Sequence, residues 1–144
     1  MEGIVSSINI SDRKGQRKKP VKVARITKYG IEGDAHAGEW HRQISLLAEE
    51  SIEKMRKKGL QIGYGDFAEN ITTKGINLAE IKVGQRLRIG NEVIVEVTQI
   101  GKKCHDECEI KRLIGECIMP KEGIFARVIV EGTIKVGDKI TVIK

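Results

Sequence analysis

The stretch GIFARVIVEGTIKVGDKITVI, from Gly123 to Ile143, decides the fold class, since it is rich in β-branched residues and is interrupted by Glu131 and Gly132. Such residues favour strands, and a turn between two of these runs predicts a β-hairpin. A second hairpin, with a Gly-Asn turn, is predicted over QRLRIGNEVIVEVTQIG, residues 85–101. The end of the chain is therefore predicted to be β-rich.

A short frame, Ile-Lys-Val-Gly, occurs at the start of residues 81–89 and again at the start of residues 134–142. Each copy puts a glycine and a polar residue before a predicted strand. Two interpretations stay open. The chain uses one common turn chemistry twice, or two related β-units close one barrel.

Two strands and a helix are predicted nearer the start of the chain. GIVSSINI, residues 3–10, predicts a strand, and VKVARITKYG, residues 21–30, predicts a half-buried strand with Val21, Val23 and, less cleanly, Ile26 on the core side. Next, LAEESIEKMRKKG predicts a helix with acidic residues in its first turn, lysines in its last and a glycine after it.

Composition bounds the class of protein. At 144 residues and 40% hydrophobic content, we expect a single domain over residues 1–144 with one core. The net charge is +6, partly from DRKGQRKKP, residues 12–20, which is interpreted as a solvated loop with anion contact as the alternative. Aromatic residues make up only 3%, so there is no platform for base stacking and no nucleic-acid partner is expected.

We expect a cytoplasmic protein with no membrane partner. No apolar run approaches the roughly 18 residues that a membrane span needs, and MEGIVSSINI does not have the pattern of a secretory signal. The three cysteines are therefore expected to be reduced thiols.

Scarce side chains gather in GIEGDAHAGEWHRQISLL, residues 30–47, which holds two of the three histidines and the only tryptophan. On a strand, Asp34 and His36 would face the same side, and Arg42 offers a planar fork for phosphate or carboxylate. The alternative is that Asp34 pairs with Arg42 while Trp40 fills the interior of a barrel.

A second group of polar residues lies in GDFAENIT, residues 65–72, where Asp66, Glu69 and Asn70 flank Phe67. Carboxylate and amide groups of this kind could serve acid–base work or hydrogen-bond a heterocycle. The alternative is ordinary turn capping by aspartate and asparagine.

The cysteines supply a third candidate site. Cys104 follows two lysines and precedes His105, and neighbouring positive charge raises the thiolate fraction of a cysteine. We interpret it as a reactive thiol. Zinc binding by Cys104, Cys108, Cys117 and His105 is an alternative with unusual spacing, and three buried, inert cysteines are another.

Taken together, four motifs resemble the MOSC domain family. They are GDAHAGEWHRQISLL, GDFAENITT, the cysteine after VTQIGKKC, and GIFARVIVEGTIKVGDKI. The family is found at the C-terminus of eukaryotic molybdenum cofactor sulfurases and as stand-alone bacterial proteins. The resemblance, from about Gly3 to the end, implies a mainly β fold with a few short helices. It also implies a closed or partly open barrel like the β-barrel domain of pyruvate kinase.

The same resemblance implies a pocket for the pterin-based molybdenum cofactor, molybdopterin. It implies that Cys104, which follows Gln99 by five residues, is the catalytic thiol, carrying sulfur as a persulfide or ligating molybdenum, with Cys108 as the alternative. The residues predicted to bind the cofactor are Asp34, His36, Arg42, Phe67, Glu69, Asn70 and Arg127.

The predicted function is therefore that of a sulfur carrier or sulfurtransferase that binds molybdenum cofactor or a related metal–sulfur species. A non-catalytic module that binds and delivers the cofactor is one alternative. A small molybdenum-dependent reductase is another. No motif marks a lysine for a pyridoxal-phosphate Schiff base, so the expected partners are a separate, pyridoxal-phosphate-dependent cysteine desulfurase as donor and a molybdoenzyme as acceptor.

Overall fold

The structure is a computed structural model that describes residues 2–14, 16–101 and 122–143. All three cysteines and the short helix that CEIKRLIG (residues 108–115) suggests lie outside the described residues. The roles predicted for Cys104 and Cys108 therefore remain predictions.

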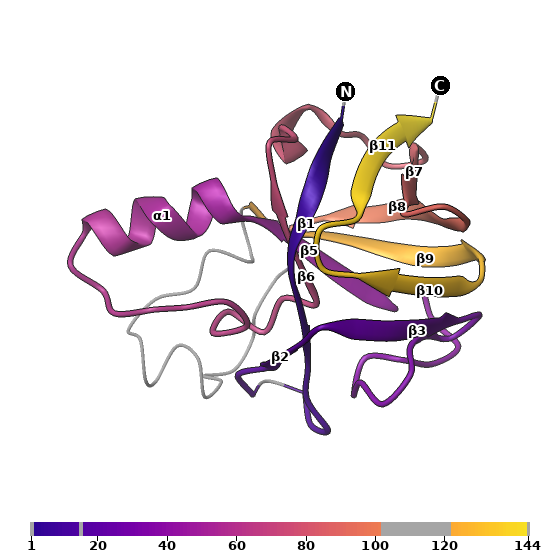
Figure 1. Cartoon of the computed structure of the whole chain (residues 1–144), viewed down its shortest axis with the longest axis horizontal. Coiled ribbons are helices and arrows are strands. Elements are labelled where there is room, and N and C mark those ends of the chain that lie inside the picture. Colours follow the sequence, from indigo (N-terminus) through magenta and orange to yellow (C-terminus); the bar gives the residue numbers. More distant parts are fainter. Residues whose placement is uncertain (1, 15, 102–121, 144) are drawn as a thin grey trace.

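A closed β-barrel dominates the fold (Figure 1). In spatial order its strands are β11 (Lys139–Ile143), β7 (Arg86–Ile89), β8 (Val93–Ile100), β9 (Ile124–Val130), β5 (Ile44–Ala48), β6 (Ile71–Lys74) and β1 (Glu2–Ile10). Pairing of β11 with β1, which places Thr141 opposite Glu2, closes the barrel. This confirms the predicted mainly β barrel.

Smaller elements extend the barrel. Strand β2 (Lys19–Val21) pairs with β1, and β10 (Gly132–Lys135), β3 (Val23–Thr27) and β4 (Gly30–Ile31) form a second sheet. A 3-10 turn, η1, spans Leu78–Glu80. Helix α1 (Glu49–Lys57) connects the parallel neighbours β5 and β6 and projects outside the barrel (Figure 1).

Strand β5 is buried on both faces, because it separates two cores. Ile44 and Leu46 belong to the cluster inside the barrel. Leu47 belongs to an exterior cluster together with Phe67 and Phe125. Each fully buried side chain of this size contributes roughly 1.5–3 kcal/mol through removal of apolar surface from water. The exterior cluster thereby fixes α1 and the segment before β6 on the outside of the barrel.

The predicted helix is confirmed. Ile52 and Met55 are buried against the exterior cluster, the acidic first turn and basic last turn suit the helix dipole, and Gly59 follows with φ +94°. The predicted hairpin β7–β8 is confirmed as well, with Leu87 opposite Val95.

The second predicted hairpin is wrong in its pairing. Strands β9 and β10 follow each other in sequence, but β10 pairs with β3, and β9 lies between β8 and β5. The chain leaves the barrel at Glu131, whose Oε2 accepts the backbone N–H of Lys28 at 2.8 Å. A turn that looks local therefore connects two different sheets.

The prediction of which residues in 21–30 face the core is also partly wrong. Val23 is 57% exposed, whereas Ala24 and Ile26 are buried. The strand is broken at Lys22 between β2 and β3, and this break shifts the alternation by one residue.

The repeated Ile-Lys-Val-Gly frame forms the same turn twice. The glycines, Gly84 and Gly137, both have φ +95°. Gln85 Oε1 accepts the backbone N–H three residues earlier at 2.7 Å, and Asp138 Oδ2 does the same at 2.9 Å. The strands that follow, β7 and β11, are neighbours in the barrel. The same turn thus precedes two neighbouring strands of the barrel, and both interpretations of the repeat stay open.

Candidate functional site

A series of turns between β4 and β5 holds Asp34 and His36 together. Asp34 Oδ2 accepts the backbone N–H of His36 at 2.9 Å, a bond by which aspartate commonly stabilises a turn. The segment is not a strand. The two-residue spacing therefore brings the pair together through the turn.

The ammonium group of Lys18 is buried beside this turn. Its Nζ lies 2.7 Å from Asp34 Oδ1 and 3.1 Å from both His36 Nδ1 and Ser11 Oγ. The side chains of Lys18 and Asp34 have no exposed area. Because a buried charge is unfavourable unless it is paired, these groups form one ion-paired cluster. The structure thus pairs Asp34 with Lys18, where the sequence alternative paired it with Arg42.

Asp34 is held in its ionised form. Burial by itself raises the pKa of this carboxyl group, but the Lys18 ammonium group and the backbone N–H of His36, which both donate to it, favour the carboxylate, and the pKa lies well below its usual range. The backbone N–H of Ser11 adds a further bond at 3.1 Å. The carboxylate is therefore a fixed negative charge at neutral pH.

Trp40 covers the outer side of the same loop. Its Nε1 donates to the His36 carbonyl oxygen at 2.7 Å, and the two rings stack with centroids 6.3 Å apart. Lys14 Nζ lies 4.1 Å and Arg42 Cζ 4.7 Å from the Trp40 ring, within the range of cation–π contacts. Trp40 is partly exposed, so it does not fill the barrel as the alternative supposed. We call Lys14, His36, Trp40 and Arg42 the Trp40 surface.

Arg42 brings an unsatisfied donor to this surface. Its guanidinium group also lies over the Phe125 ring, at 5.7 Å. Its Nε is buried and has no hydrogen-bond partner among the described residues. A buried N–H without a partner is unfavourable, and an anionic oxygen would satisfy it with a charge-assisted bond.

His41, between Trp40 and Arg42 in the sequence, links the Trp40 surface to strand β8. His41 Nε2 lies 2.9 Å from Gln99 Oε1, and Thr98 Oγ1 donates to the His41 carbonyl oxygen at 2.6 Å. Gln99 Nε2 in turn donates to the carbonyl oxygen of Gly101 at 2.7 Å. Residues 98–101 are therefore anchored to the Trp40 surface.

Glu69 lies in a buried polar network at the start of β6. Its Oε2 accepts the Gly65 N–H at 2.9 Å and the Thr72 hydroxyl at 2.7 Å. Its Oε1 is buried without a partner among the described residues. Burial raises the pKa of Glu69, and the bonds from Gly65 and Thr72 oppose that rise.

Asn70 and Phe67 make contacts inside the protein. Asn70 Oδ1 accepts the Ser45 N–H at 3.0 Å, and its Nδ2 donates to the Asn9 carbonyl oxygen at 3.1 Å. Phe67 is only 1% exposed and packs in the exterior cluster. These contacts tie β1, β5 and the start of β6 together.

The two predicted motifs meet at the basic run. The Lys18 N–H donates to the Gly65 carbonyl oxygen at 2.8 Å, and Ala35 N–H donates to Ser11 O at 2.8 Å. Gly65 has φ +84°, and a Cβ there would lie 2.2 Å from the Lys18 carbonyl oxygen, so only glycine fits. A pocket of about 310 Å³ opens beside this junction, lined by residues 16–20 and two residues of the 63–70 segment.

Arg127 lies on the outer face of β9, two residues after Phe125. Its Nη2 lies 2.8 Å from Glu96 Oε2, and hydrogen bonds from Arg127 and Arg86 lower the pKa of Glu96. The recorded contacts of Arg127 thus go to a neighbouring strand. They do not go to the Lys18 cluster.

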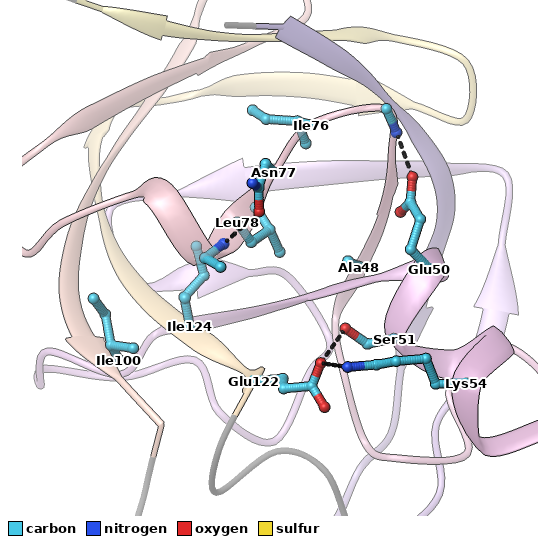
Figure 2. Close-up of a pocket in the computed structure, with 12 residues that line it drawn as sticks. Ala48, Glu50, Ser51, Lys54, Ile76, Asn77, Leu78, Ile100, Glu122 and Ile124 are labelled. Carbon is cyan, nitrogen blue, oxygen red and sulfur yellow. Dashed lines mark hydrogen bonds and ion pairs between the residues drawn. The ribbon is translucent and has the colours of Figure 1, made fainter.

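A different pocket, of about 560 Å³, opens where β5 and β6 finish (Figure 2). Apolar residues such as Leu78 line it, and Glu122 Oε1 accepts from Ser51 Oγ at 2.8 Å and Lys54 Nζ at 2.7 Å at its edge. Its described lining contains none of the predicted site residues. We therefore place the candidate site at the Trp40 surface.

Lys14, Lys18 and Gln99 were not among the residues predicted to bind the cofactor. Lys18 lies in a run interpreted as solvated, and Gln99 was used only to locate Cys104. The described residues hold no group of three or more histidine, cysteine, aspartate or glutamate side chains placed to bind a metal. None of the described helices has the length and apolar character needed to cross a membrane.

Comparisons with known proteins agree with this fold. The MOSC domain profile matches residues 33–141. YuaD from Bacillus subtilis superposes with a TM-score of 0.80 at 20% identity, over 97% of this chain and 94% of that chain. YiiM from Escherichia coli superposes with a TM-score of 0.74 at 18% identity, over 100% of this chain and 70% of that chain. YiiM from Geobacillus stearothermophilus superposes with a TM-score of 0.72 at 20% identity, over 99% of this chain and 75% of that chain.

A search of curated proteins finds no match. At these identities the structural likeness shows the fold alone. The profile match, by contrast, spans most of the sequence and includes both polar motifs of the site. The chain therefore belongs to the MOSC domain family.

Proposed function

We propose that the protein binds the molybdenum cofactor and carries or transfers sulfur through the thiolate of Cys104. Membership of the MOSC family suggests a function related to this cofactor. The observation that carries the proposal is the link between His41 and Gln99, at 2.9 Å. This link joins the Trp40 surface to the strand that leads to Cys104, five residues after Gln99 in the sequence.

The described residues fit the cofactor's phosphate. The buried Nε of Arg42 has no partner among the described residues and would gain one from a phosphate oxygen. Lys14 adds positive charge over the same tryptophan ring. We propose that Arg42, Lys14 and His36 contact the cofactor, whereas Phe67, Glu69 and Asn70 support the loops from inside. When bound, the cofactor supplies a soft metal centre that accepts sulfur.

The proposed chemistry at Cys104 is thiol–persulfide exchange. The thiolate attacks the terminal sulfur of a donor persulfide, a new sulfur–sulfur bond forms on Cys104, and the donor's own sulfur–sulfur bond breaks to release its thiolate. One sulfur–sulfur bond replaces another and the terminal sulfur keeps its proton, so the exchange is redox-neutral and needs no oxidant. The partners that this proposal requires are a pyridoxal-phosphate-dependent cysteine desulfurase as donor and a molybdoenzyme as acceptor. We propose that the exchange takes place in the cytoplasm.

Cofactor binding can be tested with the single tryptophan as reporter. Molybdenum cofactor released from a purified molybdoenzyme is titrated against the protein while Trp40 fluorescence is followed. We expect saturable quenching, and Arg42→Leu should weaken binding about 10–100-fold, as expected for loss of a hydrogen bond to a charged group. Arg88→Leu, an exposed change on β7, is the matched control. Equal affinity of the Arg42 variant and the wild type would contradict the proposed site.

Sulfur transfer needs a separate test. The protein is incubated with a cysteine desulfurase and cysteine and then digested for mass spectrometry. We expect an added mass of about 32 Da, one sulfur atom, on the Cys104 peptide. Cys104→Ser should abolish it, and Cys117→Ser should not. Cofactor binding without any added sulfur would support a delivery module and refute the carrier role.

A further inference from the structure

We propose that Lys18 is a positioning residue for His36. By donating a hydrogen bond to His36 Nδ1, it holds the imidazole in the neutral form that carries its proton on Nε2. The proposal deepens the proposed function, since it says what kind of group His36 offers to a bound molecule. The role of His36 as a donor to the cofactor rests on the proposed function, whereas the test of its protonation state does not.

The hydrogen bonds around Lys18 determine where the ring proton lies. Ser11 Oγ donates its own proton to the Arg13 carbonyl oxygen at 2.9 Å, so it accepts from Lys18 at 3.1 Å. Asp34 Oδ1 accepts at 2.7 Å. An ammonium group has donors only. The 3.1 Å contact with His36 Nδ1 is therefore a hydrogen bond only if Nδ1 carries no proton.

The competing arrangement puts the proton on Nδ1 and directs it at Asp34 Oδ2. That distance is 3.5 Å, which is long for an N–H···O hydrogen bond. Oδ2 already accepts the backbone N–H of His36 at 2.9 Å. The arrangement would also set an N–H group against the Lys18 ammonium at 3.1 Å. The geometry thus favours the proton on Nε2.

The consequence concerns what His36 can do at the Trp40 surface. A neutral imidazole with its proton on Nε2 is a hydrogen-bond donor at that atom, which lies on the ring edge away from Lys18. Stacking on Trp40, with only 5° between the ring planes, fixes the orientation of that edge. His36 therefore recognises an acceptor oxygen of the bound molecule and does not serve as a general base. Lys18 acts through His36, without touching the ligand.

Nuclear magnetic resonance tests the protonation state directly. Long-range proton–nitrogen correlation spectra are recorded at neutral pH on the nitrogen-labelled, cofactor-free protein, and the His36→Gln spectrum identifies the His36 signals among the three histidines. We expect an unprotonated Nδ1 and a protonated Nε2. A proton on Nδ1, or on both nitrogens, would overturn the proposal. This readout is independent of whether the cofactor binds.

Variants test the part played by Lys18. Lys18→Met removes the ammonium group beside Nδ1 and leaves the Asp34 carboxylate there, so the ring proton should move wholly or partly to Nδ1. Lys19→Met, a neighbouring exposed change, should keep the wild-type pattern. An unchanged pattern in folded Lys18→Met would overturn the proposal. If that variant does not fold, the wild-type spectrum still decides where the proton lies.

The donor role is tested by affinity for the released molybdenum cofactor. Glutamine keeps an N–H donor near the position of Nε2, so His36→Gln should stay within about threefold of the wild type. His36→Leu should lose about tenfold, as expected for one hydrogen bond. Equal affinity of the leucine variant and the wild type would overturn the donor role. Failure of the wild type to bind any cofactor would instead count against the proposed function.

Discussion

Replacing Lys18 by methionine removes the ammonium group that neutralises Asp34 while keeping a buried aliphatic chain of similar length. At 2.7 Å and an effective dielectric constant of about 20, the attraction between the two charges is about 6 kcal/mol. Desolvation of both groups offsets part of this. Removing one partner of a buried pair lowers stability by about 3–5 kcal/mol. We expect a loss of that size at pH 7, since Asp34 is left buried and charged.

The assay is urea unfolding monitored by Trp40 fluorescence. Lys19→Met is the exposed control, and its free energy of unfolding should lie within about 0.5 kcal/mol of the wild-type value. The double variant Lys18→Met/Asp34→Asn should recover at least half of the loss, because no buried charge then remains.

The pH dependence follows from the sign of the shift. The lowered pKa of Asp34 stabilises the wild type above the ordinary carboxyl pKa of about 3.9, and this stabilisation is lost as the pH falls below it. In Lys18→Met the unpaired carboxyl group takes up a proton more easily. The difference between variant and wild type should therefore shrink from pH 7 to pH 4.

The reasoning would be refuted by a loss below about 1 kcal/mol in Lys18→Met, since exposed ion pairs contribute no more than that. Additive effects of the changes at Lys18 and Asp34 would refute it as well, because residues in direct contact should couple.

Three further outcomes are expected from the same unfolding assay. Gly65→Ala should destabilise by about 3 kcal/mol or more, because it combines strain at φ +84° with a Cβ only 2.2 Å from the Lys18 carbonyl oxygen; a loss within 1 kcal/mol would argue against this packing. Ala68→Gly should stabilise by about 1 kcal/mol, since Ala68 has φ +62°, and a clear loss would speak against strain there. Burial raises the pKa of Glu69, so the free energy of unfolding of the wild type should fall as the pH rises above the ordinary glutamate pKa. The stability of Glu69→Gln relative to the wild type should therefore increase from pH 4 to pH 8. Parallel pH curves for the two proteins would contradict the raised pKa.

Elements with a local signal were predictable from the sequence. Helix α1 shows its apolar face and its end charges within nine residues, and the hairpin β7–β8 carries its own turn. The partner of β10 has no such local signal. It pairs with β3, from the other end of the chain, because strand pairing depends on tertiary contacts as well as on local sequence.

In the candidate site, too, local features were predictable from the sequence and contacts between distant segments were not. Asp34 and His36 were predicted to lie together because residues two apart face the same side of a strand, whereas the structure brings them together through a turn. Lys18 could not be told from Lys19 by composition, yet one is buried and the other exposed. The difference comes from the close approach of Gly65, which lies far away in sequence. Cys104 lies outside the described residues, and its role stays a prediction.

Closure of the barrel by β11 bears on how the protein is made. Ribosomes synthesise β1 early and β11 last among the barrel strands, yet the two pair side by side. Until β11 has left the exit tunnel, the nascent chain holds β1 and β7 with open edges, and such edges recruit other chains. A message cut short before the codon for Lys139 should therefore yield a polypeptide that needs chaperones or is degraded.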